Sequence, residues 1–334
     1  MNIALSNLPW LEPIVKIIQG DNISQNVQII AKAIGVPLAG ILVFLMIWHG
    51  AASNIETSLG NFPGPADVYE QSKGLIAEHF AEREKAEAFY ERQDERNAAR
   101  MANDPDYVPK IRDYTGKATY FDQILTSLIT VMTGFILASI IAIPLGILTG
   151  LSSTLNAAFN PIIQIFKPVS PLAWLPLVTM VVSAVYVSDD PTVPKSFINS
   201  MITVMLCSLW PTLLNTSVGV ASISPDLQNV SQVLRLNFIT HVTKIVLPSA
   251  IPMMFTGLRL SLGIAWMVLI AAEMLAQNPG LGKFVWDEFQ NGSSDSLGRI
   301  MVAVITIGLI GFALDRLMLS LQKAVSWDKS ANVR

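Results

Sequence analysis

Long segments without a single formal charge limit the folds that are open to this chain. Residues 123–166 contain no Asp, Glu, Lys or Arg, and the same holds for residues 33–55 and 197–221. A helix needs about 20 mostly apolar residues to cross the hydrocarbon core of a bilayer. Only 14% of the chain is charged, whereas soluble proteins contain about 25%. The sequence therefore predicts an all-α membrane protein.

The lengths of the apolar segments predict about six transmembrane helices. The expected spans are Ala33–Trp48, Ile124–Leu148, Val169–Val187, Phe197–Ala221, Pro252–Met274 and Ile300–Leu321. The stretch Gly150–Pro161 contains Gly, Ser and Asn at short intervals, so we expect it to be a short loop between the second and third spans.

The distribution of Lys and Arg predicts the orientation of these spans, because short cytoplasmic loops carry an excess of both residues. With a cytoplasmic N-terminus, the cytoplasmic face collects Lys16, Lys32, Lys167, Arg235, Lys244, Arg259, Arg316, Lys323, Lys329 and Arg334. The short loops of the other face hold only Lys195, Lys283 and Arg299. Both termini are therefore expected in the cytoplasm.

The chain divides into four parts on this basis. They are the cytoplasmic N-terminus and first span (1–50), a polar extracytoplasmic insertion (51–119), a transmembrane domain of five spans with a cytoplasmic loop at 222–250 (120–321), and a cytoplasmic tail (322–334). Within the insertion, charges at helical spacing predict a helix over Gln71–Met101 that Asp104-Pro105 ends. This helix could be a solvated spacer or a docking arm for an extracytoplasmic partner, and the residues leave both open.

Composition excludes several classes of protein. A single cysteine, Cys207, excludes an internal disulfide framework, and the three histidines lie too far apart in sequence to predict a metal site. The net charge of −3 argues against a nucleic-acid partner. The sequence also lacks the Gly-x4-Gly-Lys-Ser/Thr phosphate loop of ATP-binding proteins.

The loop at 222–250 has the pattern of two short helices. Ser224-Pro225-Asp226 is a helix-start signal, and a second helix is expected to begin near Phe238. Val230, Val233, Leu234 and Leu236 give the first helix an apolar stripe. Such a helix can lie on the bilayer, pack as a connector or enter a groove of a partner. The residues alone favour the connector.

A resemblance to a known family changes that preference. Asn229–Pro252 resembles the EAA loop of binding-protein-dependent ABC importer permeases, because the end of the pattern is matched by Ile245-Val246-Leu247-Pro248. Two positions differ from the pattern: the Glu-Ala-Ala positions hold Asn229-Val230-Ser231, and the Gly position holds Arg235. The flanking segments resemble the nitrate/sulfonate/taurine branch, and nitrate permeases most of all. Those segments are Lys167–Pro176, Trp210–Thr216, Gly257–Trp266, Ala271–Met274, Gly280–Gly282 and Trp286–Glu288.

The resemblance implies a type I ABC importer permease in a bacterial inner membrane. It implies that this chain is not an enzyme and holds no cofactor, because separate cytoplasmic subunits bind ATP and Mg²⁺. An extracytoplasmic binding protein delivers the solute, and a second permease copy, giving a homodimer, completes the pathway. The resemblance also implies that the loop transmits the ATPase motion through Asn229, Val230, Ser231, Val233, Leu234, Arg235, Leu236, Leu247 and Pro248.

The expected solute is a small oxyanion, with nitrate (or nitrite) first. Taurine, alkanesulfonates, bicarbonate and cyanate are alternatives within the family, and an ion-coupled secondary transporter is an alternative of another class. Candidate pathway residues are Arg259, Thr256, Ser261, Thr212 and Asn215. Arg259 could instead lie at the cytoplasmic interface and pair with a carboxylate or a phospholipid, and hydroxyl side chains in membrane helices often bond their own backbone or a neighbouring helix.

Overall fold

The computed structural model describes residue 17 and residues 22–57, 60–104, 106–187 and 193–325. The chain forms two compact units, residues 1–70 and 71–334. In the described part, the only strands are β1 (Glu56–Thr57) and β2 (Gly60–Asn61), which pair antiparallel. The expectations for residues 1–16, which include Lys16, and for Pro105 and the tail residues Lys329 and Arg334 lie outside the described residues.

The first unit contains the expected first span. Helix α2 (Ile23–Ile30), a π-helical turn η1 (Ala31–Gly35) and α3 (Val36–Ala52) follow one another without a break. They provide an apolar helix over Ser24–Ala52 whose side chains are largely exposed. The Trp48 indole N–H donates to the Pro63 carbonyl oxygen at 3.1 Å and so ties the end of α3 to the residues after the hairpin.

The second unit is a helix bundle around α8 (Lys195–Ala221), which packs against α5 (Tyr120–Leu151) on one side and α11 (Leu247–Ala276) on the other. Helix α13 (Ser296–Val325) packs against α11. Small residues recur on α5 every four positions: Gly134, Ala138, Ala142, Gly146 and Gly150. They allow close approach, since a Cβ added at Gly146 would lie 2.7 Å from the Leu213 carbonyl oxygen.

Five long apolar helices confirm five of the expected spans, and the remaining one differs. Helices α6 (Ser153–Phe166) and α7 (Pro171–Val185) meet at a bend of 100° and together form one broken span or a re-entrant loop. The loop predicted at Gly150–Pro161 is wrong, because the Ser152 hydroxyl caps α6 by accepting from Leu155 N–H at 3.3 Å.

The third predicted span, Val169–Val187, is also too long. Helix α7 has 15 residues, about 22 Å of helix, which is less than the hydrocarbon core. It begins after Pro168 and the N-cap Ser170, and Phe166 stacks on Trp174 across the bend with ring centroids 5.7 Å apart.

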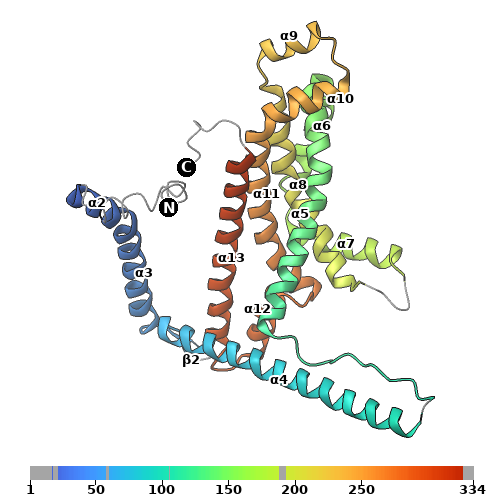
Figure 1. The fold of residues 1–334 in the computed structure, drawn as a ribbon. Coiled ribbons are helices and arrows are strands. Elements are labelled where there is room, and N and C mark those ends of the chain that lie inside the picture. The colour runs from blue at the N-terminus through green and yellow to red at the C-terminus, as the bar shows by residue number, and fades with distance from the viewer. Residues whose placement is uncertain (1–16, 18–21, 58–59, 105, 188–192, 326–334) are drawn as a thin grey trace. The chain divides into compact units, whose positions relative to one another are not determined.

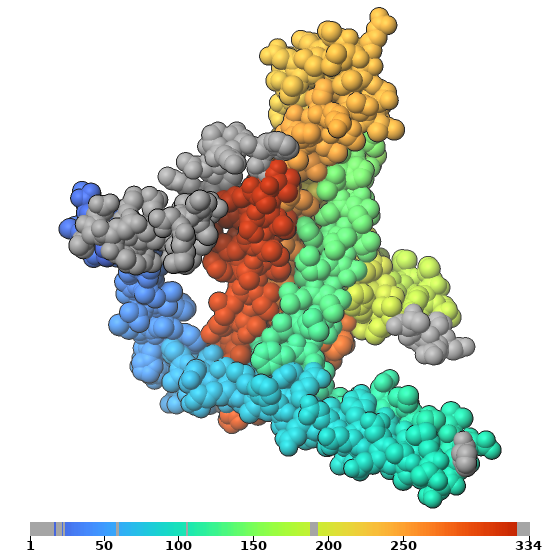
Figure 2. Space-filling model, viewed as in Figure 1, coloured from blue at the N-terminus to red at the C-terminus, as the bar shows by residue number. Residues whose placement is uncertain are grey.

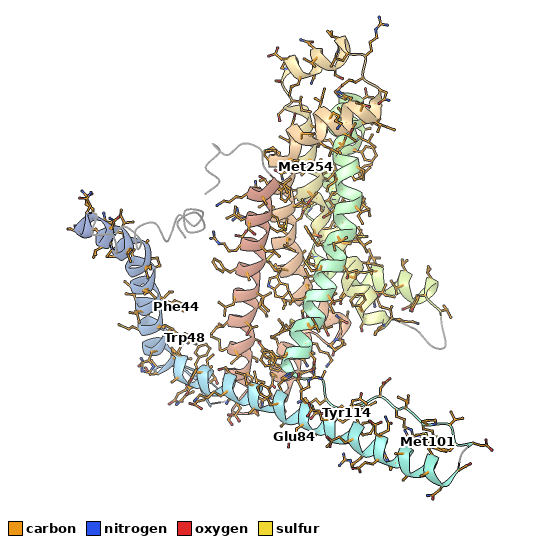
Figure 3. The ribbon with its side chains drawn as sticks, viewed as in Figure 1. Phe44, Trp48, Glu84, Met101, Tyr114 and Met254 are labelled. Atoms are coloured by element: carbon orange, nitrogen blue, oxygen red, sulfur yellow. The ribbon has the colours of Figure 1, made fainter. Side chains whose placement is uncertain are left out.

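The polar insertion is a long helix with an extended return segment. Helix α4 (Pro65–Asn103) confirms the helix expected at Gln71–Met101 and begins earlier. Residues 106–119 run back along it (Figure 3), where Asn97 donates to the Lys110 carbonyl oxygen at 3.1 Å and the Tyr114 hydroxyl donates to Glu82 at 2.8 Å. That hydrogen bond from Tyr114 holds the pKa of Glu82 below its ordinary value.

The bundle has two different ends (Figure 1). At one end lie α9 (Pro225–Val233), α10 (Phe238–His241) and the π-helical turn η2 (Val242–Val246), which form a protruding lobe (Figure 2). At the other end lie α12 (Leu281–Asn291) and the second-unit part of α4. Arg299 of α13 joins these two helices through ion pairs to Glu288 of α12 and Glu78 of α4. The loop expected at 222–250 and the second-unit part of the polar insertion, residues 71–119, therefore lie at opposite ends of the bundle.

Candidate functional site

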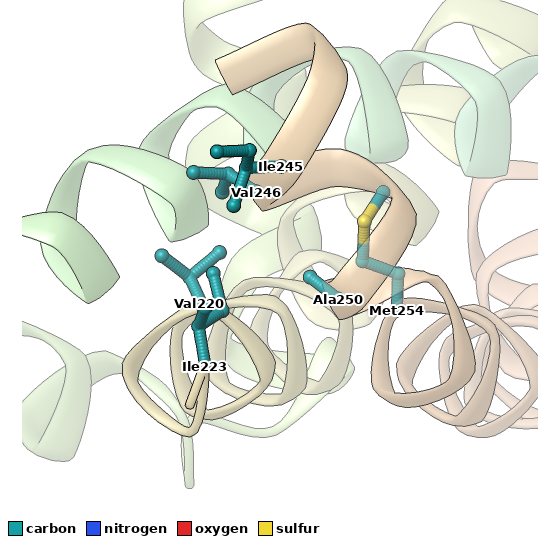
Figure 4. Packing of buried hydrophobic residues seen from close by; sticks show 6 residues of the cluster. All are labelled: Val220, Ile223, Ile245, Val246, Ala250 and Met254. Carbon is teal, nitrogen blue, oxygen red and sulfur yellow. The ribbon is translucent and has the colours of Figure 1, made fainter. Parts of the chain in front are cut away.

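The protruding loop is built from the two helices that the sequence predicts. Helix α9 starts after Ser224 with Pro225 in its first turn, and α10 starts at Phe238. The Ser231 hydroxyl lies 2.7 Å from Nδ1 of His241, so the two helices are hydrogen-bonded to each other. A cluster of Val220, Ile223, Ile245, Val246, Ala250 and Met254 fixes the base of the loop to the bundle (Figure 4).

Arg235 ends α9 in a conformation that usually belongs to glycine. Its φ is +47°, in the left-handed region. The N–H of Arg235 donates to the Gln232 carbonyl oxygen at 3.0 Å, and the N–H of Leu236 donates to the Ser231 carbonyl oxygen at 3.1 Å. These two bonds are those of a Schellman helix end. The resemblance assigns Gly to this position, and the backbone keeps the glycine-type turn with arginine in its place.

The predicted apolar stripe divides into two parts. Val230, Val233 and Leu234 are exposed, with Val233 80% and Leu234 63% accessible. Leu236, beyond the turn, instead packs against the cluster at the base of the loop. Of the other residues expected to couple, Asn229, Arg235 and Pro248 are exposed, Ser231 is buried, and Leu247 packs against the same cluster. The lobe thus presents apolar side chains on a fixed base.

A charged pair joins α11 to α13 on a partly accessible face of the bundle. The Nη2 group of Arg259 donates to Oδ2 of Asp315 at 2.8 Å, and its Nε donates to Oδ1, so the contact is bidentate. Both side chains are about one-third accessible. Arg259 lies twelve residues after Leu247, the first residue of α11, about 18 Å along the helix. Arg259 therefore lies well inside α11 and not at its end.

The pair borders a cleft of about 620 Å³. The cleft is lined by Thr256, Leu260, Gly263, Ile264, Met267 and Gln322 in addition to the pair. The structure therefore brings two of the candidate pathway residues, Arg259 and Thr256, to one place. The Thr256 hydroxyl donates to the Pro252 carbonyl oxygen at 2.9 Å.

The other three candidate pathway residues lie where α8 packs against α11. Thr212 and Ser261 are buried, and both the hydroxyl and the N–H of Thr212 donate to the Ser261 oxygen, at 2.7 and 3.0 Å. The Asn215 amide donates to the Pro211 carbonyl oxygen at 2.8 Å. These hydrogen bonds occupy the polar groups within the bundle, in the manner expected of hydroxyls that join membrane helices.

A second charged residue of α11, Glu273, lies at the end near α12. It is fully buried, and both of its oxygens are within 3.0 Å of the Ser127 hydroxyl of α5. The N–H of Gly282 donates to it at 3.0 Å. The space is tight, since a Cβ at Gly280 would lie 2.1 Å from its Oε1. Glu273 therefore joins α11 to α5 and α12 through buried hydrogen bonds.

Comparison with known proteins identifies the family. The profile of the binding-protein-dependent transport system inner membrane component matches residues 142–327. The chain belongs to this family. It is an ABC importer permease, a multi-pass inner-membrane transport component that acts with ATP-binding and solute-binding partners. This membership decides against the ion-coupled secondary transporter.

Two relatives align along most of this permease. It is 34% identical over 86% of its length to the bicarbonate transport system permease protein CmpB of Synechococcus elongatus, of which it covers 87%. It is 32% identical, again over 86% of its length, to the nitrate import permease protein NrtB of Synechocystis sp., of which it covers 88%.

A solved structure confirms the type I fold. The inward-facing MetNI methionine ABC transporter aligns with a TM-score of 0.52, covering 62% of this permease and 95% of that chain at 13% identity. This likeness concerns the fold alone.

Sequence reasoning missed the partner of Arg259. Asp315 is 56 residues away on another helix, and no spacing rule links the two positions. The one available signal was that each is a charged residue inside an apolar segment, which is costly unless the charge is paired or faces water.

Proposed function

We propose that this permease forms the translocation pathway for a small planar oxyanion, with nitrate as the first candidate and bicarbonate as the second. The observation that supports this is its similarity, over 86% of its length in each case, to a permease named for bicarbonate and to one named for nitrate. Both anions carry one negative charge on oxygens around a planar centre. A guanidinium recognises such an edge through two parallel hydrogen bonds.

The exposed side of the α9–α10 lobe would contact the ATP-binding subunit. The apolar surface of the lobe is made by three side chains that the described part of the chain leaves exposed: Val230, Val233 and Leu234. The cluster at its base and the Ser231–His241 hydrogen bond make the lobe a rigid lever. ATP and Mg²⁺ would be bound by that partner, and closure of the two ATPase subunits would move the lobe as a rigid body and switch the pathway.

The same proposal gives the topology and assembly. Both termini and the lobe would be cytoplasmic, and α12 and residues 71–103 of α4 would lie on the extracytoplasmic side, because the short loops expected on the cytoplasmic face carry the excess of Lys and Arg. Two copies of the permease would enclose the pathway. The insertion, a helix tied to its return segment by side-chain hydrogen bonds, would be a docking arm for the solute-binding protein.

The pathway itself would pass the cleft at Arg259 and Thr256. A cation on a helix face with apolar neighbours is unfavourable against lipid, so this face is better suited to a wet path between subunits. Here Arg259 would supply positive charge to an anion, and the Thr256 hydroxyl a polar contact.

Reconstitution tests the proposal. The permease, its ATP-binding subunit and its solute-binding protein are placed in proteoliposomes, and uptake of labelled nitrate and labelled bicarbonate is measured with and without ATP. ATP-dependent uptake of either anion supports the oxyanion pathway and names the solute. ATP-dependent uptake of neither anion by a complex that hydrolyses ATP would refute it.

A further inference from the structure

We infer that the Asp315 carboxylate is a built-in competitor for the transported anion, which occupies the Arg259 guanidinium until the anion displaces it. This inference rests on the proposed function, because it assigns the residues that receive the oxyanion. In this role the ion pair between α11 and α13 is a gate at the anion site, and not only a structural contact.

The geometry of the pair supports this role. Arg259 uses Nε and Nη2, one edge of its guanidinium, to hold both oxygens of Asp315. A carboxylate and a planar three-oxygen anion present the same kind of edge, two oxygens in one plane. Because the edge of a guanidinium accepts one such partner at a time, Asp315 and the anion exclude each other there.

The surroundings distinguish this pair from a buried structural bridge. Each side chain is about one-third accessible, and the cleft beside them has a volume of about 620 Å³, ample space for a small anion. Several apolar neighbours on the two helices are exposed, among them Leu260, Met267 and Phe312. A charged pair on such a face is costly against lipid, which favours a wet path or a subunit interface at this position.

The pairing has a consequence for affinity. With Asp315 in place the pair has no net charge, and a free anion meets Arg259 only in the fraction of molecules in which the pair is open. The apparent affinity is reduced by that fraction. Weak retention suits a pathway, because an anion that binds tightly would leave slowly.

Two substitutions separate a gate from a structural ion pair. Asp315→Asn removes the competing charge and leaves Arg259 free, so we expect nitrate to bind the permease–ATPase complex about tenfold more tightly. Arg259→Gln removes the receiving group, so we expect nitrate binding to be lost. A merely structural bridge is broken equally by both substitutions, which would then shift binding in the same direction.

The experiment measures equilibrium binding of labelled nitrate to complexes in lipid nanodiscs, with labelled bicarbonate in parallel. Asp315→Glu keeps the pair and should bind as the unsubstituted protein does. Asp287→Asn, which removes the ion-paired carboxylate of Lys283 on α12, is the matched control for loss of one acidic charge and should also leave binding unchanged. Thermal unfolding of each variant shows that it is folded.

The outcomes are distinct. Opposite effects of Asp315→Asn and Arg259→Gln support the gate. If both substitutions change nitrate binding in the same direction, or if neither changes it, the gate is overturned. The proposed function still stands in that case if the unsubstituted complex shows ATP-dependent uptake. If the unsubstituted complex transports neither anion, the proposed function fails and the gate fails with it.

Discussion

Helix α11 contains two charged residues, Arg259 and Glu273, and their surroundings differ in almost every respect. Glu273 is fully buried and accepts hydrogen bonds from neutral donors on α5 and α12. Arg259 is partly accessible, is held by the single carboxylate of Asp315 and borders a cleft. The same helix therefore carries one polar group enclosed by the fold and one open to exchange.

This difference shows how a polar residue in a membrane helix can be assigned a role. A group whose partners are all fixed and buried holds helices together, because removing it leaves its donors without acceptors. A group with one replaceable partner beside a cleft can release that partner for a ligand. Burial and the number of partners, not charge alone, separate the two cases.

The largest effect on stability is expected for Glu273→Ala. The change leaves the Ser127 hydroxyl and the Gly282 N–H without their acceptor in a buried site, so the free energy of unfolding should fall by about 3 kcal/mol or more. Thermal unfolding of the detergent-solubilised permease measures this. Glu273→Gln keeps one acceptor oxygen and should lose less. An unchanged unfolding temperature for Glu273→Ala would remove the distinction between the two sites.

A second prediction extends the comparison to an exposed apolar residue. Leu234→Asp should leave the unfolding temperature unchanged, because the side chain is mostly exposed. It should lower nitrate-stimulated ATP hydrolysis by about 30-fold, since a charge would enter the apolar contact with the ATP-binding subunit. Leu234→Met is the control that preserves the contact. Normal stimulated hydrolysis in Leu234→Asp would exclude the lobe from coupling.

A third prediction addresses the shape of the open site. Arg259→Lys keeps the positive charge but loses the planar edge with two parallel donors, so ATP-dependent uptake should fall by about tenfold. Because the pair is partly accessible, the unfolding temperature should change little. Uptake equal to that of the unsubstituted protein would mean that charge alone suffices, and a drop in stability as large as that of Glu273→Ala would make both sites structural.

The smallest effect is expected at the turn after α9. Arg235→Gly removes the cost of a left-handed conformation at a non-glycine residue, and should raise the free energy of unfolding by about 0.5–1 kcal/mol. A calorimetric scan measures the gain, and Gln232→Gly, in the preceding helical turn, is the control that should destabilise. Loss of stability in Arg235→Gly would show that the arginine side chain has a stabilising contact.

The sequence predicted the elements whose signals are local. The start of α9 follows from Ser224-Pro225, and the long helix α4 follows from its charge spacing. Helix α6 was missed because serine is common in turns, and Ser152 was interpreted as part of a loop. In the structure its hydroxyl caps the first turn of a helix. The same side chain serves both purposes, and only the backbone after it decides which.

Contacts between distant segments could not be predicted in the same way. The pairing of Arg259 with Asp315, and that of Glu273 with Ser127, joins residues 56 and 146 positions apart. Their geometry depends on how the helices cross, and close approaches at glycines contribute to those crossings, such as Gly134 of α5 against α8 and Gly311 of α13 against Trp266 of α11. The sequence indicated which residues were costly to bury, but not which partners would satisfy them.

Uptake of labelled nitrate at micromolar concentration, in cells with and without this permease and with or without ATP depletion, tests the central claim most directly. We expect an ATP-dependent component of nitrate uptake, or of bicarbonate uptake, that is lost in the cells without the permease. If the cells that have the permease contain the assembled complex and still take up both anions at the same rate as the cells without it, an oxyanion pathway through this chain is contradicted.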